Sequence, residues 1–416
     1  MAGRAVQLRA AYEISVTMTS HTPDTLIIGA GLAGLSVAWW LRGHGRVCLV
    51  DMATQPGAEA SSQNAGMLRR LGEDPYERTL AQRVHALLES PPTEALADPL
   101  LSRRTGAVLA LAHDPFHLHD AVSGLRARGV HLDELDSTML AEVAPAMAGA
   151  PVVRAWHLAD ERVVDAGLMV AALMHDLRRA DTAVDIRMGT VVDELVVSGG
   201  RVTGVRMGSE VLHAGRVVLA GGAWCRALMA RHGLFRPLIP LRRTLVQTAA
   251  ERPVGPHPWC WVDDVGVYIR PEGEGWLISG CDEAVDVPSG MHPGSRGPVG
   301  EAERALALEK VARWFPALGE LRATGGWTGL RTFAPDRRPV LGADPDLSGL
   351  WWCAGLGGFG VTCGLAAGEA VAAWLLGDTV GFLRDPPAVS AGRRFFGRWP
   401  IRPVGDMARM RLVSVR

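Results

Sequence analysis

Three glycines near the start of the chain have the spacing that dinucleotide binding requires. Gly29, Gly31 and Gly34 form the pattern G-x-G-x-x-G, and Asp51 follows Gly29 by 22 residues. The first glycine permits a tight turn, the second lets a pyrophosphate approach the backbone, and the third lets a helix pack closely on a strand. An acid about 20 residues further on accepts a ribose hydroxyl hydrogen bond. The motif does not separate FAD from NAD, but an acid at position 51 disfavours NADP.

A second constellation lies near the other end of the chain. It consists of GLRTFAPD at 329–336, PVLG at 339–342 and GLGGFGV at 355–361. Arg331 carries a planar guanidinium, which can hold a carboxylate through two hydrogen bonds. The alternative is a surface salt bridge, with Asp336 as the candidate partner.

Weaker candidates for substrate contact are Arg242 or Arg243, and Tyr268. The tyrosine can donate its hydroxyl to a carboxylate or simply pack in a sheet, and both interpretations stay open. No Ser-His-Asp set has the spacing that nucleophilic catalysis would need. None of the six scattered cysteines forms a C-x-x-C pair, so we expect no metal site. Scattered cysteines also favour a reducing compartment, and we expect a cytoplasmic protein.

The elements around these motifs point to an α/β fold. A strand over 24–28, a helix to about Arg42 and a strand over 46–50 form a β-α-β unit. Apolar strands at 216–220 and 349–354 run into further glycine clusters. Residues 75–150 have a mainly helical pattern, a strand is expected over 186–192, and 240–282 reads as antiparallel strands. One discontinuous nucleotide-binding domain with an inserted second domain follows from this order.

Composition excludes several classes. With 48% hydrophobic and 21% charged residues, the 416-residue chain is typical of a folded protein of two or three domains. The formal net charge of −1 argues against bulk binding to nucleic acid. Residues 384–416 hold eight arginines against two aspartates, which would suit a peripheral membrane contact, but we favour a solvated tail.

Four segments of the chain resemble, in their sequence and their order, the FAD-dependent D-amino-acid oxidase superfamily. The nearest resemblance is to bacterial D-amino-acid and D-arginine dehydrogenase-like enzymes and to glycine and sarcosine oxidases. The segments are IIGAGLAGLSVAWWL with Asp51, SSQNAGM at 61–67, VVLAGGAWC at 217–225, and GLRTFAPDRRPVLG with CAGLGGFGVTCGLAAGEAVAAWL.

The resemblance implies a Rossmann-like FAD-binding domain over 22–75, 155–235 and 325–380. It implies an inserted α+β substrate domain, built on antiparallel strands, over 76–154 and 236–324. Residues 1–21 and 381–416 would be tails.

The resemblance also implies the site residues. Arg331 would hold the substrate carboxylate, with Tyr268 and Arg243 as its companions. The expected FAD contacts are Gly29, Gly31, Leu32, Ala33, Gly34, Asp51, Met52, Ser61, Ser62, Asn64, Ala65, Gly66, Val191, Val192, Gly222, Trp224, Arg331, Gly357, Gly358, Phe359, Gly360, Val361 and Thr362.

The implied reaction is oxidation of the CH–NH bond of an amino acid, D-amino acids being favoured, by hydride transfer to flavin N5. The imino acid would hydrolyse to a keto acid and ammonia, and oxygen or a quinone would accept the electrons. The alternatives are a secondary amine oxidase of the sarcosine or proline type, an NAD-dependent dehydrogenase, and a flavoprotein without catalysis.

Two departures from the family pattern bear on cofactor and substrate. Gly329 stands where sarcosine-oxidase-type enzymes attach flavin to a cysteine, so we expect non-covalent FAD. Met67 and Ala97 stand where the arginine-dehydrogenase-like pocket has a histidine and an acid. A substrate guanidinium would lack its charge partner there, which predicts a more apolar amino acid.

Overall fold

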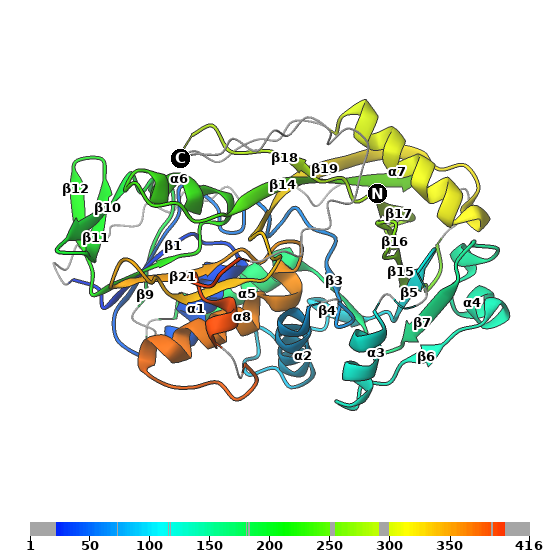
Figure 1. The fold of residues 1–416 in the computed structure, drawn as a ribbon, viewed down its shortest axis with the longest axis horizontal. Helices are drawn as coiled ribbons and strands as arrows, with labels where there is room; N and C mark the ends of the chain where they lie inside the picture. The colour runs from blue at the N-terminus through cyan, green and yellow to red at the C-terminus, as the bar shows by residue number, and fades with distance from the viewer. Residues whose placement is uncertain are drawn as a thin grey trace, which may run out of the picture.

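The computed structural model describes residues 22–395, except 73, 115, 117, 180, 182–183, 250–253, 291–298 and 384–385. Strands from both ends of this region form one six-stranded sheet in the order β20-β21-β13-β1-β2-β9 (Figure 1). All neighbours are parallel except β20 and β21. The strands are β1 Thr25–Ile28, β2 Val47–Val50, β9 Val184–Arg187, β13 Arg216–Leu219, β20 Val340–Ala343 and β21 Leu350–Ala354. The predicted β-α-β unit is therefore confirmed.

Helices α1 (Leu32–Leu41) and α8 (Gly360–Leu376) pack against each other beside this sheet. A Cβ on Gly368 would lie 2.3 Å from Ser36 Cβ, so only glycine permits this approach. Nearer the amino-terminal ends, a Cβ on Gly364 would lie 3.5 Å from Leu32 Cβ. This contact places the amino-terminal ends of an early and a late helix side by side.

A nine-stranded sheet forms the other part of the molecule, to the right and top of Figure 1. Its order is β18-β14-β17-β16-β15-β5-β7-β6, and β19 pairs with β14 along the other edge. Neighbours are antiparallel except β5 and β15. The strands are β5 Ala107–Leu111, β6 Asp133–Glu134, β7 Arg154–Leu158, β14 Ile239–Ala249, β15 Trp259–Val262, β16 Val267–Glu272, β17 Gly275–Ser279, β18 Ala284–Val285 and β19 Arg322–Phe333.

The expectation of a mainly helical segment over 75–150 is wrong in part. Strand β5 lies inside this sheet, and β4 and β6 also fall in the segment. The sequence of β5, AVLAL, is buried at all five positions. A short apolar run of this kind has no alternation to distinguish a strand from a buried helix. The predicted strand over 186–192 is also shorter, since β9 ends at Arg187.

Two three-stranded sheets and six more α-helices complete the fold of the described ranges. The small sheets contain β3 Met67–Leu68, β8 Arg162–Val164 and β4 Ser102–Arg104, and β10 Glu194–Ser198, β11 Arg201–Met207 and β12 Glu210–His213. The helices are α2 Pro75–Glu89, α3 His119–Arg126, α4 Ser137–Val143, α5 Ala166–Leu177, α6 Cys225–Ala230 and α7 Glu301–Trp314. No helix within the described ranges has the length and hydropathy to cross a bilayer. The mixed α/β architecture is as expected, and the domain boundaries stay a prediction.

The described part of the carboxyl-terminal segment, 386–395, packs on the protein. Val389 is fully buried, and Ala391 is nearly so. Arg393 pairs with Asp336 through two contacts, Nε to Oδ2 at 2.7 Å and Nη2 to Oδ1 at 2.8 Å. The solvated-tail interpretation therefore does not describe these residues. Residues 1–21, 384–385 and 396–416 lie outside the described part.

Candidate active site

The carboxyl ends of four parallel strands meet at one edge of the six-stranded sheet. Gly29 follows β1, Asp51 follows β2, Ala220 follows β13 and Gly355 follows β21. All four line one pocket, which continues to β14, β16 and β19 of the larger sheet. Ligands of open α/β sheets bind at this edge, because the loops there diverge and leave a crevice.

The first glycine motif has the geometry that its spacing predicts. Gly29 has φ +112°, and a Cβ there would lie 2.6 Å from the carbonyl oxygen of Ala220. A Cβ on Gly34 would lie 1.8 Å from the carbonyl oxygen of Gly29. Ser61 Oγ accepts a hydrogen bond from the Leu32 amide at 2.9 Å, at the amino-terminal end of α1. Gly34 itself is off the pocket wall, so it acts through close packing.

Asp51 is held in place by the backbone. Its carboxylate accepts hydrogen bonds from the amides of Ala30 and, at 2.7 Å, of Ala53. Burial raises the pKa of Asp51, although both hydrogen bonds oppose this shift. Each carboxylate oxygen has a second lone pair, which leaves it able to accept from a ribose hydroxyl.

The amino-terminal end of α8 opens into the same pocket. Residues 357–362 line the wall, and no acidic side chain lies in the first turn of the helix. Unpaired amide groups give this end a partial positive charge, which favours an anionic or electron-rich ligand group. A Cβ on Gly358 would lie 2.7 Å from Nη1 of Arg331, so glycine lets that guanidinium approach the helix.

Arg331, Arg243 and Tyr268 meet at the end of the pocket that β14, β16 and β19 form. Arg331 on β19 is opposite Leu241 on β14, which makes Arg243 its diagonal neighbour on the same face. Both arginines and Tyr268 line the wall. Tyr268 is 4% exposed, and its ring centre lies 4.9 Å from that of Trp261. Burial raises the pKa of Tyr268, although Arg243 opposes the shift, so its hydroxyl stays a donor.

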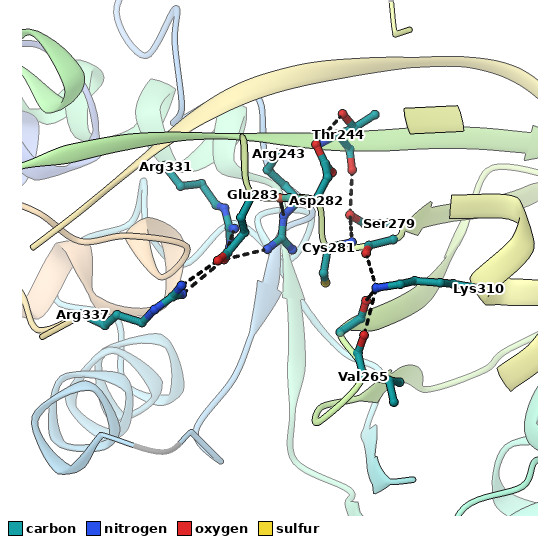
Figure 2. Close-up of polar contacts among 12 residues, drawn as sticks. Arg243, Thr244, Val265, Ser279, Cys281, Asp282, Glu283, Lys310, Arg331 and Arg337 are labelled. Atoms are coloured by element: carbon teal, nitrogen blue, oxygen red, sulfur yellow. Dashed lines mark hydrogen bonds and ion pairs between the residues drawn. The ribbon is translucent and has the colours of Figure 1, made fainter. Parts of the chain in front are cut away.

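Glu283 joins the guanidinium groups, as Figure 2 shows. Its Oε1 lies 2.8 Å from Nη2 of Arg331, and its Oε2 lies 2.6 Å from Nη2 of Arg337. Burial alone would raise the pKa of Glu283, but the Arg337 hydrogen bond and the neighbouring positive charges lower it to about 2. Burial and then Arg243 lower the pKa of Arg331 to about 10, so it stays charged at neutral pH. The surface salt bridge between Arg331 and Asp336 is therefore not formed, since Arg331 pairs with Glu283 and Asp336 with Arg393.

Sequence reasoning missed Arg69, Trp261 and Glu283, and it covered Gln63 only as a member of the segment from Ser61 to Gly66. Arg69 lines the pocket, where its guanidinium lies 4.3 Å from the ring centre of Trp261, and its Nη1 pairs with Asp263 at 2.8 Å. Gln63 also lines it, and a Cβ on Gly329 would lie 2.9 Å from Gln63 Cβ. The segment SSQNAGM carried the only signal, for Gln63. The other three depend on contacts between distant strands.

Four buried polar atoms on the pocket wall have no hydrogen-bond partner among the residues that the structure describes. They are Oε1 of Gln63, Nε of Arg69, Nε1 of Trp261 and Nε of Arg331. Buried polar atoms are ordinarily paired, so their gathering at one pocket fits a polar ligand that supplies the partners. Together with the glycine turns and the two helix ends, they make the pocket suited to FAD and a small carboxylate.

Most predicted site residues lie on this wall. Those that line it are Gly29, Gly31, Leu32, Ala33, Asp51, Met52, Ser61, Asn64, Ala65, Gly66, Val192, Gly222, Trp224, Arg243, Tyr268, Arg331, Gly357, Gly358, Phe359, Gly360, Val361 and Thr362. Gly34, Ser62 and Val191 do not, and Val191 lies beyond the end of β9. Met67 lines the pocket, whereas Ala97 is exposed and off its wall. The expectation that Ala97 replaces a pocket acid is therefore wrong.

Comparison with known proteins gives one family. Residues 24–374 match the model of the DAO family, described as FAD dependent oxidoreductase. The chain is also 30% identical over 319 residues to a D-amino acid dehydrogenase of Cereibacter sphaeroides, covering 75% of this chain and 67% of the relative.

Solved structures share the fold. Glycine oxidase from Geobacillus kaustophilus has a TM-score of 0.75 at 23% identity, covering 91% of this chain and all of that one. L-proline dehydrogenase from P. horikoshii has a TM-score of 0.76 at 17% identity, covering 89% and 97%. The expected Rossmann-like cofactor domain with a substrate domain is confirmed by the family and these folds.

Proposed function

This chain belongs to the DAO family of FAD-dependent oxidoreductases, and we propose that within it the chain oxidises the CH–NH bond of an α-amino acid, with D-amino acids favoured. The observation that carries the proposal is the place of Arg331. Its half-buried guanidinium lines the pocket that the dinucleotide motif and the end of α8 also line. The relative named a D-amino acid dehydrogenase supports the D configuration.

Arg331 binds the substrate carboxylate, and Tyr268 adds a neutral O–H donor beside it. Arg331 already gives one Nη2 hydrogen bond to Glu283, which restricts its rotation, while its Nε has no partner. A carboxylate held at two points fixes the orientation of Cα, and such positioning lowers the entropic part of the barrier. The substrate amine must be neutral, so that its lone pair assists as the Cα–H bond breaks.

FAD, when bound, would supply the hydride acceptor for this reaction. Gly29, Gly31 and the amide end of α1 would hold its pyrophosphate, Asp51 its ribose, and the α8 end its ring. The attachment is non-covalent, because Gly329 offers no nucleophile and its close contact with Gln63 leaves no room for a side chain.

The substrate side chain is apolar, and the acceptor of the electrons is oxygen or a quinone. The wall near Arg331 contains Leu245, Trp261 and Met67, and the described wall has one arginine besides Arg331 and Arg243, namely Arg69, which is paired with Asp263. A charged substrate side chain would therefore find no free partner among the described residues. We place the reaction in the cytoplasm, in keeping with six free cysteines.

The test is an anaerobic screen of the purified flavoprotein. The flavoprotein is mixed with D- or L-amino acids or with N-methyl amines, and the absorbance of oxidised flavin at about 450 nm is followed. An apolar D-amino acid should remove the absorbance fastest. Faster loss with N-methyl amines would support a secondary amine oxidase instead, and no loss with any amino acid would overturn the proposal.

A further inference from the structure

Glu283 is the meeting point of three arginines at the substrate end of the pocket (Figure 2). Its carboxylate contacts Arg331 at 2.8 Å, Arg337 at 2.6 Å and Arg243 at 3.4 Å. Arg331 and Arg243 line the pocket, whereas Glu283 is off the wall. The carboxylate therefore reaches the two arginines from behind, on the side away from the pocket.

The chain before Glu283 is fixed by a set of hydrogen bonds, which Figure 2 draws. Ser279 Oγ donates to the carbonyl oxygen of Thr244 at 2.7 Å, and the Asp282 carboxylate accepts from the amide and hydroxyl of Thr244 at 2.8 and 3.0 Å. Lys310 Nζ donates to the carbonyl oxygen of Gly280 at 2.8 Å. The segment thus fills the stretch of β14 between its pairings with β17 and β18. Glu283 is a preorganised carboxylate rather than a mobile surface acid.

The charges of this cluster leave room for one more anion. Arg331, Arg243 and Arg337 contribute three positive charges, and Glu283 and Asp282 contribute two negative charges. The cluster therefore carries one net positive charge, which a single substrate carboxylate neutralises. Without Glu283 the same arginines would carry enough charge for two carboxylates, and a buried charge without a partner is costly.

We propose that Glu283 is a specificity residue that pairs, from behind the pocket wall, with the guanidinium groups that a second substrate carboxylate would need, and so restricts the site to monocarboxylates. The inference rests on the proposed function, because it takes Arg331 as the carboxylate site. A dicarboxylate bound at Arg331 would find Arg243, a second guanidinium on the wall, already paired with Glu283. Removal of that charge frees donors of Arg331 and Arg243, the two members of the cluster that line the pocket, for the second carboxylate.

The experiment compares succinate with butyrate, which have the same four-carbon chain and differ in one carboxylate. Binding of each to the FAD-loaded protein is measured by calorimetry for the wild type, Glu283→Ala and Glu283→Gln. Both substitutions should raise the ratio of succinate to butyrate affinity by about tenfold or more, because the second carboxylate of succinate then gains an arginine as its charge partner. Glu283→Gln keeps the size of the side chain, so it serves if the alanine variant does not fold.

Glu303→Ala is the matched control. Glu303 pairs with Arg242 at 2.6 Å, on the strand that also carries Arg243, and is off the pocket wall. Its removal changes the net charge equally, so it should leave the affinity ratio unchanged. An unchanged ratio in both Glu283 variants, or an equal rise in Glu303→Ala, would overturn the inference alone. A wild-type protein that binds neither ligand would instead contradict the carboxylate site, and with it the proposed function.

Discussion

The two ends of the pocket are formed by different groups, the main chain at one end and charged side chains at the other. At the proposed cofactor end, the backbone would supply the contacts, through the turn at Gly29, through Gly31 and through the amide ends of α1 and α8. At the substrate end, charged side chains supply them, and Glu283 holds Arg331 from behind. Backbone contacts require a residue type at a fixed spacing, whereas side-chain contacts require the meeting of distant strands. We therefore expect small steric changes to abolish binding at the cofactor end. At the substrate end, we expect activity to fall in proportion to the charge or hydrogen bond that is removed.

The largest expected effect is at the cofactor end. In Gly34→Ala, the new Cβ would meet the carbonyl oxygen of Gly29, which is part of the backbone and cannot move aside cheaply. We expect a loss of about 3 kcal/mol in the free energy of unfolding, with loss of bound FAD. Flavin content and thermal unfolding of the purified variant measure both.

Gly124→Ala is the control for that change. Gly124 lies in α3, where a new Cβ would contact nothing within 4 Å. Alanine favours helix by about 1 kcal/mol, so this variant should be as stable as the wild type or more so. Full FAD content in Gly34→Ala would show that the close packing of α1 on β1 is not what the site needs.

At the substrate end, Tyr268→Phe should give an intermediate effect. The variant keeps the ring against Trp261 and removes one neutral hydrogen bond, so kcat/KM should fall about tenfold while FAD stays bound. Tyr76→Phe, on α2 and off the pocket wall, should leave kcat/KM unchanged. An unchanged kcat/KM in Tyr268→Phe would show that the tyrosine hydroxyl does not contribute and that Tyr268 acts by packing alone.

The same contrast explains how much the sequence could predict. Gly29, Gly34 and Asp51 follow a local pattern within one β-α-β unit, so their elements and the close approaches at the two glycines could be predicted, and the ribose contact of Asp51 stays a prediction. Glu283 was not, because its partners Arg243 and Arg331 lie 40 and 48 residues away on two other strands. Strand β5 was missed for a related reason, since its burial comes from neighbours β7 and β15 rather than from its own pattern.

A smaller effect is expected at Lys310, the only lysine of the chain. Its Nζ donates to the carbonyl oxygens of Val265, Gly266 and Gly280, a convergence that the planar guanidinium of arginine cannot reproduce. Lys310→Arg should lower the free energy of unfolding by about 1 kcal/mol. Arg313→Lys on the same helix is the comparison, and an equal loss there would show that the convergence on Gly280 is unimportant.

The smallest effect is a difference in acid stability. The pKa of Glu283 is about 2 in the folded protein against an ordinary value of 4.5, so its carboxylate stabilises the fold above pH 4.5, and this stability is lost as pH falls through 2. The advantage of the wild type over Glu283→Gln in the free energy of unfolding should therefore shrink as pH falls from about 5 to 3. Denaturant unfolding at several pH values measures it, and a constant advantage would contradict the pairing.

The most direct test of the whole account compares the wild type with Arg331→Ala in one anaerobic experiment. Flavin content is measured first, and the rate of flavin reduction is then followed against the concentration of the best D-amino acid. The account predicts equal FAD content, a saturable rate in the wild type, and at least about a hundredfold loss of reduction efficiency in the variant. Equal rates in the two proteins, or a wild type that binds no FAD, would contradict it.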